Sequence, residues 1–255
     1  MSTAPPTQHI LSELGFAVSQ NDADLVGAAP IIPEMCVPGT PHLRTSVLAA
    51  WTDHLSGLLA VSVMAPLVPV TIELDVHLVA PAPGSGAVRC TARALKAGRS
   101  VFMAGVTFTT DGGDPIAVGG GSFMVAPDPS LRLPFTPSLD GPPPVQILRV
   151  PLAQRAGCER REPGVAVLPR SEDGLNSSNT VNGGLIALAA EEAVLSLEPD
   201  GETLSSLSLR YLRPVRVGPA VATAQTRSGL GQIEVRDAGN ENRLSVLATA
   251  RFFDR

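Results

Sequence analysis

Two stretches of the chain alternate apolar and polar residues with a period of two, and the two stretches match each other. The first is Glu73–Val88 and the second is Ser206–Val221; their apolar positions align, and Pro81 then falls where Pro214 falls. Alternation with period two is typical of a strand that buries one face. The pattern predicts two equivalent half-buried strands, and therefore a chain that contains one structural unit twice.

A long apolar run without internal proline precedes each of these strands. Thr45–Ala65 precedes the first strand and Gly183–Leu197 precedes the second, and both are followed closely by proline. Runs of this length and composition indicate largely buried helices. Each predicted helix carries an acidic residue at the same place, Asp53 in the first and Glu191 in the second. An unpaired charge in an apolar helix is costly, so both carboxylates are candidate functional residues.

After each helix the chain offers further strands separated by glycine or Asp/Asn turns, so each half predicts a helix followed by an antiparallel meander. A stretch rich in proline lies between the halves and indicates an extended connection. We therefore expect an N-terminal domain over residues 1–128, a linker over 129–151 and a C-terminal domain over 152–255. Short segments before each helix are expected to lead into the two halves.

Composition narrows the class of protein. Of the 255 residues, 44% are hydrophobic and 17% are charged, which allows a sizeable core. The net charge of −5 disfavours a nucleic-acid partner. Three scattered cysteines form no CxxC pair, which predicts no metal site and no disulfide framework but reduced thiols in the cytoplasm. The apolar run near 55–70 is interrupted by serine, glycine and proline, so no membrane span is expected, and the N-terminus lacks signal-peptide features.

The most specific motif lies just before and inside the second helix. Asn176 and Asn182 precede the pair Gly183–Gly184, and Glu191 follows within the helix. This order resembles hotdog acyl-CoA thioesterases of the phenylacetate-pathway type, whose signature is an Asn, then His-Gly-Gly, then a helix bearing Asp or Glu. Asn182 stands where that family has histidine. One helix wrapped by a curved antiparallel sheet, present twice, resembles a double hotdog of the α+β class.

The resemblance implies an acyl-CoA thioesterase that forms a homodimer or homotrimer. Coenzyme A would enter as part of the substrate, and no other cofactor and no metal is expected. The first N–H groups of a helix lack intrahelical partners, so they can hold the oxyanion that develops on an attacked thioester carbonyl. Glycine lets the substrate approach that backbone closely.

Helix geometry shows that one helix cannot provide both the oxyanion site and the carboxylate. Glu191 follows Gly183 by eight residues, or about 12 Å along the same axis, so an antiparallel second helix must bring the carboxylate. Two composite sites are possible. The favoured site combines Asn176, Asn182 and Gly183 with Asp53. The other combines Pro38, Arg44 and Thr45 with Glu191.

Structural interpretations stand beside these functional ones. The asparagines can cap a helix or hold a turn, and Arg44 can pair with Asp53. Glu191 and Glu192 point about 100° apart, so one of the two is expected to be solvated. Competing functions are a non-catalytic acyl-CoA-binding protein and a hotdog enoyl-CoA hydratase or dehydratase. A final open question concerns three arginines with period three, which can bind phosphate or line a solvated edge: Arg210, Arg213 and Arg216.

Overall fold

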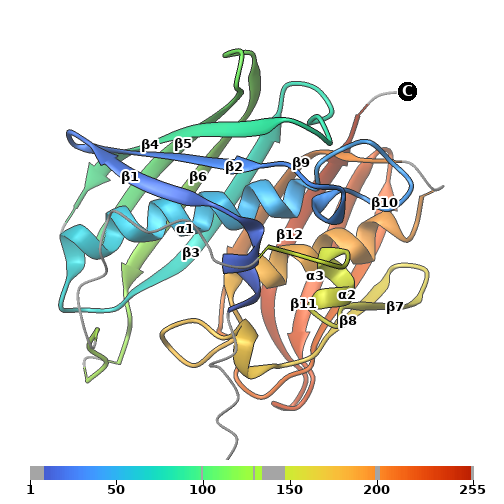
Figure 1. Cartoon of the computed structure of the whole chain (residues 1–255). Helices are drawn as coiled ribbons and strands as arrows, with labels where there is room; N and C mark the ends of the chain where they lie inside the picture. The colour runs from blue at the N-terminus through green and yellow to red at the C-terminus, as the bar shows by residue number, and fades with distance from the viewer. Residues whose placement is uncertain (1–8, 99, 129, 134–146, 199–201, 254–255) are drawn as a thin grey trace, which may run out of the picture.

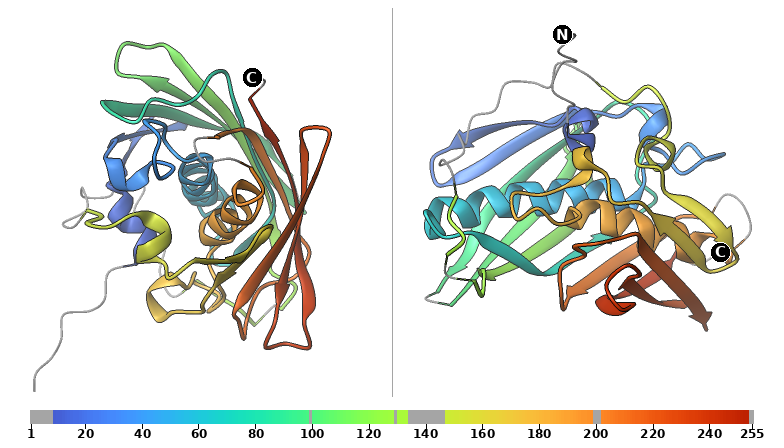
Figure 2. Two further views of the ribbon diagram at one scale, coloured as in Figure 1. Left: turned by 90° about the vertical axis from the view of Figure 1, so that its right-hand side faces the viewer. Right: turned by 90° about the horizontal axis from the view of Figure 1, so that it is seen from below.

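The computed structural model describes residues 9–98, 100–128, 130–133, 147–198 and 202–253. Two helices, α1 and α3, lie side by side against the concave face of one curved antiparallel sheet (Figure 1; Figure 2, left). The 3₁₀ turn near the N-terminus and the short helix α2 lie on the opposite side of the two helices (Figure 2). This is the architecture of a double hotdog, and the predicted α+β fold class is confirmed.

The helices are α1 (Thr45–Met64), α2 (Leu152–Arg155) and α3 (Gly183–Leu195). Short 3₁₀ turns cover Ile10–Leu14, Pro33–Met35 and Glu172–Gly174. The strands of the first half are β1 (Ala17–Asn21), β2 (Asp24–Pro30), β3 (Pro69–Leu78), β4 (Ala87–Ala97), β5 (Val101–Thr110) and β6 (Pro115–Val125). Those of the second half are β7 (Glu159–Glu162), β8 (Val165–Leu168), β9 (Leu204–Tyr211), β10 (Ala220–Arg227), β11 (Leu230–Asp237) and β12 (Arg243–Phe252).

The strand order of the sheet repeats itself in reverse about its centre. Among the described residues the order is β1-β2-β4-β5-β6-β3, followed by β9-β12-β11-β10-β8-β7. Each strand of the first half therefore has a counterpart at the same distance from the β3–β9 pair. The sheet is continuous, yet it consists of two equivalent halves related by a pseudo-twofold axis at its centre.

The register of the central strands confirms the sequence repeat. Asp75 lies opposite Ser208, and Leu74 lies opposite Leu209 while Val76 lies opposite Leu207. The separation between Asp75 and Ser208 is the separation that aligns the two prolines in the sequence, 133 positions. The pseudo-twofold axis therefore passes through the β3–β9 pair.

Helix α1 is the centre of the hydrophobic core. This 20-residue helix is long and apolar enough to cross a membrane by length and composition alone. Its most apolar stretch of 18 residues has a mean hydropathy of 1.4, but 61% of that stretch is buried within the protein. The wrapped sheet and α3 provide this burial. An almost uniformly apolar helix is expected wherever protein surrounds a helix on most sides.

Glycines let the layers approach each other closely. A Cβ on Gly119 of β6 would lie 2.6 Å from Thr52 Oγ1 of α1, and a Cβ on Gly184 of α3 would lie 2.8 Å from Ala50 Cβ. A side chain at either position would push the layers apart. Packing between the layers therefore requires glycine at both positions, which accounts for Gly184 of the predicted glycine pair.

The structure extends the sequence interpretation in one respect. The segments expected only to lead into each half form β-hairpins, β1–β2 and β7–β8, and each extends the sheet at its outer edge. The expected linker over 129–151 lies largely outside the described residues. The strands β1–β6 end at Val125 and helix α2 begins at Leu152, so both fall within the expected halves.

Candidate active site

The two central helices run antiparallel, and each places a carboxylate at the beginning of the other. Asp53 of α1 lies at the start of α3, where its Oδ2 is 3.1 Å from the position that a Cβ on Gly183 would take. Glu191 of α3 lies at the start of α1, where its Oε1 accepts a hydrogen bond from Ser46 N–H at 3.2 Å. The composite arrangement expected from helix geometry is therefore present at both ends of the helix pair.

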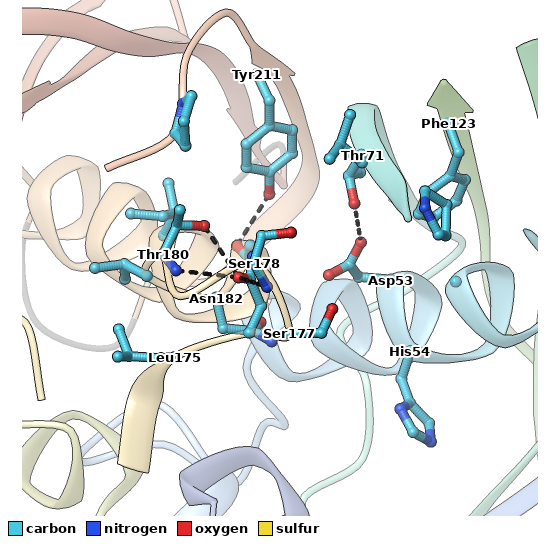
Figure 3. A pocket seen from close by; sticks show the side chains of 18 of the residues that line it. Asp53, His54, Thr71, Phe123, Leu175, Ser177, Ser178, Thr180, Asn182 and Tyr211 are labelled. Atoms are coloured by element: carbon cyan, nitrogen blue, oxygen red, sulfur yellow. Dashed lines mark hydrogen bonds between the residues drawn. The ribbon is translucent and has the colours of Figure 1, made fainter. Parts of the chain in front are cut away.

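The side chain of Asp53 is half-buried and lines a cavity. Its Oδ1 accepts a hydrogen bond from Thr71 Oγ1 of β3 at 2.8 Å (Figure 3). Burial raises the pKa of Asp53 from 3.8 to about 6, and the hydrogen bond from Thr71 opposes that rise in part. A carboxylate with a pKa near 6 is ionised at neutral pH and more basic than a solvated one, which suits a general base.

The start of α3 is organised by Asn182. This residue is the N-cap, and its Oδ1 accepts a hydrogen bond from Gly184 N–H at 2.8 Å. The Gly183 N–H is left without an acceptor among the described residues, and Gly183 lines the cavity together with Asp53. The capping interpretation of Asn182 is therefore correct, and the cap leaves the first backbone N–H of α3 available to a ligand.

Asn176 shapes the loop that precedes α3. Its Oδ1 accepts hydrogen bonds from the N–H groups of Ser178 and Thr180, at 3.0 and 3.2 Å, and from Thr180 Oγ1 at 3.1 Å. The side-chain oxygen of Asn176 accepts all three of these hydrogen bonds and thereby holds the turn. Asn176 lines the cavity, but its observed contacts are those of a residue that positions the loop.

Tyr211 belongs to the same site, although the sequence analysis treated it only as a strand position. Its hydroxyl donates a hydrogen bond to the Gly183 carbonyl oxygen at 2.9 Å (Figure 3). Burial, and then the negative charge of Asp53, raise the pKa of Tyr211, so the hydroxyl stays protonated. One signal was present in the sequence: this is the only tyrosine of the chain, and it occupies an apolar repeat position that holds leucine in the first half.

A cavity of about 1130 Å³ joins these groups. Most of its lining is apolar and comes from both halves of the chain, including Phe16, Trp51, Phe123, Ile186 and Val246. An apolar cavity with a few convergent polar groups is the usual form of a small-molecule site. Because Asp53 and Gly183 meet at its wall, a bound molecule can contact both.

His54 also lines this cavity but points away from the Asp53 carboxylate (Figure 3). Its ring stands edge-on to Phe16, with the ring centroids 6.2 Å apart. Desolvation by the surrounding protein atoms, and then the positive charge of His9, lower the pKa of His54. The side chain of His54 is exposed and is directed away from the carboxylate, so it is not placed to act together with Asp53.

The pseudo-equivalent site at the start of α1 is filled by the chain's own side chains. Arg44 contacts Glu191 at 3.1 Å and Glu192 at 2.6 Å, and all three side chains are buried. Glu191 Oε2 also accepts a hydrogen bond from Ser46 Oγ at 2.6 Å. Burial alone would lower the pKa of Arg44, but Glu191 and Glu192 together raise it.

Two expectations about this region are wrong. Arg44 does not pair with Asp53, because it lies at the opposite end of the helix pair. Glu192 is not solvated: it is 4% exposed and pairs with Arg44 and Arg160. The predicted second site, with Glu191 as its carboxylate, is thus a closed ion-pair network in which the Ser46 N–H is already occupied.

Two of the three arginines with period three lie at the border of the cavity, and the third does not. Arg213 and Arg216 line the cavity and are exposed, as is Asp128 beside them. Arg210 does not line the cavity; it pairs with Glu73 on the neighbouring strand at 3.6 Å. Across the described part of the chain, no group of three or more His, Cys, Asp or Glu side chains is arranged to hold a metal ion.

Solved structures with this fold cover nearly the whole chain. The 12:0-ACP thioesterase from Umbellularia californica is 11% identical with a TM-score of 0.68, and the match covers 93% of this chain and all of that one. An acyl-ACP thioesterase from Bacteroides thetaiotaomicron is 12% identical with a TM-score of 0.64, covering 92% and 100%. A hot dog protein of unknown function from Alicyclobacillus acidocaldarius is 15% identical with a TM-score of 0.61, covering 98% and 99%. No curated protein matches the chain in sequence.

The fold is that of hotdog proteins, and the solved structures of similar fold include thioesterases. Residues 42–117, which include all of α1, the strands β3 to β5 and the start of β6, match the model of the thioesterase superfamily. This match covers less than half of the chain, and it agrees with the resemblance to hotdog thioesterases drawn from the Asn and Gly-Gly motif.

Proposed function

We propose that the protein hydrolyses an acyl-CoA to the free acid and coenzyme A at the Asp53–Gly183 site. The observation that carries the proposal is the position of the Asp53 carboxylate, which lies 3.1 Å from where a Cβ on Gly183 would stand. A carboxylate and a helix N-terminus therefore face the same point of an apolar cavity. A thioester carbonyl bound at that point meets both groups.

Each of the two helices provides one part of the catalytic machinery: α3 stabilises the oxyanion, and α1 provides the carboxylate. The carbonyl oxygen accepts a hydrogen bond from the Gly183 N–H, whose location at the positive end of α3 stabilises the developing oxyanion. Asn182 Nδ2 can add a second donor, because its Oδ1 is the atom engaged in the cap. Tyr211 holds the Gly183 peptide in place through its carbonyl oxygen.

Asp53 then acts in one of two ways. As a general base it takes a proton from water while the water oxygen bonds to the carbonyl carbon. The tetrahedral intermediate collapses, the C–S bond breaks, and the proton on Asp53 passes to the departing thiolate. As a nucleophile Asp53 bonds to the carbonyl carbon itself, the thiolate leaves, and water hydrolyses the resulting anhydride. The thiolate is a good leaving group because thiol pKa values lie near 8.5.

The choice of coenzyme A as carrier rests on charge at the border of the cavity. Arg213 and Arg216 are exposed there, close to the end of the cavity formed by Gly183 and Tyr211. Arginine suits phosphate groups because its planar fork of donors matches their oxygens. The neighbours from Umbellularia and Bacteroides are named for acyl carrier protein substrates, so the carrier has to be tested directly.

The test is thiol release from acyl-CoA and from acyl carrier protein loaded with the same acyl group. We expect turnover of acyl-CoA by the wild-type protein and a loss of about 10²–10⁴-fold in Asp53→Asn. Arg213→Gln and Arg216→Gln should raise KM for acyl-CoA but not for an acyl-pantetheine that lacks the nucleotide. Arg210→Gln is the matched control, since that arginine pairs with Glu73 away from the cavity. Turnover of the carrier-protein substrate alone would reject coenzyme A as the carrier.

A further inference from the structure

The cavity continues along α1 well past the reaction centre. The helix contributes one face to the cavity wall, and the residues on that face recur at spacings of three and four. They are Ala50, Trp51, Asp53, His54, Gly57, Leu58 and Val61. This face spans eleven residue steps, or about 16 Å.

Most of that length lies on one side of Asp53. Val61 follows Asp53 by eight residues, so about 12 Å of the cavity wall extends beyond the carboxylate. Phe123 lies in this direction, on the side of Asp53 away from Asn182 and Tyr211 (Figure 3). Val70 lines the cavity together with Phe123, so the extension is apolar on the strand side as well.

Gly57 stands in the middle of this extension, and packing does not explain it. Gly121 of β6 provides the contrast: a Cβ on it would lie 2.5 Å from Ser56 Oγ, so the contact between α1 and the sheet excludes a side chain at position 121. A Cβ on Gly57 would meet only the Phe123 ring, at 3.8 and 3.9 Å, which is ordinary van der Waals contact. The backbone of Gly57 is helical, so it requires no special conformation. Glycine weakens a helix interior relative to alanine.

We propose that Gly57 keeps open a channel for the acyl chain, and that the substrates are thioesters of medium- or long-chain apolar acids. The chain lies along α1 from Asp53 towards Val61 and packs between Leu58 and Phe123. This inference rests on the proposed function for the position of the carbonyl. It goes further by assigning the direction, the depth and the chemical class of the acyl group.

A side chain at position 57 would divide the channel. Gly57 follows Asp53 by four residues, so it lies about 6 Å along the axis from the carboxylate. A leucine there would leave the first part of the channel open and fill the part beyond it. Short acyl groups would still reach the reaction centre, whereas long ones would meet the new side chain.

The experiment measures binding of saturated fatty acids of increasing length by calorimetry, and so does not depend on turnover. For the wild-type protein we expect affinity to rise about fourfold with each added methylene until the channel is full. For Gly57→Leu the rise should stop several carbons earlier. Ser62→Leu is the matched control, because it adds the same side chain to an exposed position of α1 that does not line the cavity.

Hydrolysis provides the second measurement. With butanoyl-CoA and dodecanoyl-CoA, Gly57→Leu should lower kcat/KM for the longer substrate at least tenfold and leave the shorter one within about twofold. Gly57→Ala, which fits without close contacts, should give a smaller shift in the same direction if the leucine variant fails to fold.

Equal length dependence in folded Gly57 variants and the wild type would overturn the channel. If the length-dependent binding changes as expected but the wild type releases no thiol from any acyl-CoA, the channel stands and the proposed hydrolysis fails. The two failures are therefore distinguishable.

Discussion

Replacement of Asp53 by asparagine should lower activity by about 10²–10⁴-fold and at the same time stabilise the fold. In the unfolded chain the carboxyl ionises near 3.8, whereas burial raises the pKa of Asp53 to about 6 in the folded protein. The protein therefore holds an ionised carboxylate at neutral pH in a place that disfavours its charge. A pKa difference of this size corresponds to at most about 3 kcal/mol. Because the side chain is open to the cavity, we expect about half of that, near 1.5 kcal/mol.

The sign of the pH dependence follows from the raised pKa. Below pH 3.8 the carboxyl is protonated in both states, so Asp53 and asparagine are equivalent. Between pH 3.8 and about 6 the unfolded chain releases its proton first, and the wild type loses stability relative to Asp53→Asn. Above pH 6 the difference is constant. Since asparagine keeps an Oδ1 that can accept the hydrogen bond from Thr71, the contact at 2.8 Å is preserved.

The assay combines thermal denaturation at pH 5 and pH 8 with thioester hydrolysis. Asp53→Asn should melt about 3–6 °C above the wild type at pH 8 and show a smaller gain at pH 5. Wild-type kcat/KM should fall tenfold per pH unit below about pH 6. His54→Gln tests whether that midpoint belongs to Asp53: it should leave the midpoint in place even if substrate affinity changes. An Asp53→Asn protein that keeps wild-type activity, or that is less stable than the wild type at pH 8, would refute the assignment.

Three further outcomes are expected. Glu191→Gln should keep kcat/KM within about threefold but lower the free energy of unfolding by about 3 kcal/mol or more, because it breaks a buried contact with Arg44. A loss of activity without a loss of stability in urea denaturation would show that Glu191, and not Asp53, is the catalytic carboxylate. Gly183→Ala should reduce kcat at least tenfold with little change in melting temperature, since its Cβ would lie 3.1 Å from the Asp53 carboxylate and 3.2 Å from the Tyr211 hydroxyl; unchanged steady-state kinetics would place the substrate carbonyl elsewhere. Light scattering at micromolar concentration should detect a homodimer or homotrimer, and a monomer alone would contradict that expectation.

The repeat, the two buried helices and the composite nature of the site follow from the sequence alone. Period-two alternation and the matched prolines fix equivalent strands, and the register of β3 against β9 reproduces the same separation. The carboxylate of the other helix was predictable because eight residues of α-helix span about 12 Å. Local periodicity and fixed helix geometry are sufficient for these conclusions.

Tertiary structure alone decided which groups surround each carboxylate. Asp53 and Glu191 occupy equivalent positions in the sequence, yet one faces a cavity and the other meets a buried arginine. Thr71 and Tyr211 join the site from strands distant in sequence, and their roles depend on the packing of those strands against the helices. A sequence pattern specifies which face of an element is buried. Whether a buried carboxylate meets a cation, a hydroxyl or an open cavity depends on side chains that only the folded chain brings together.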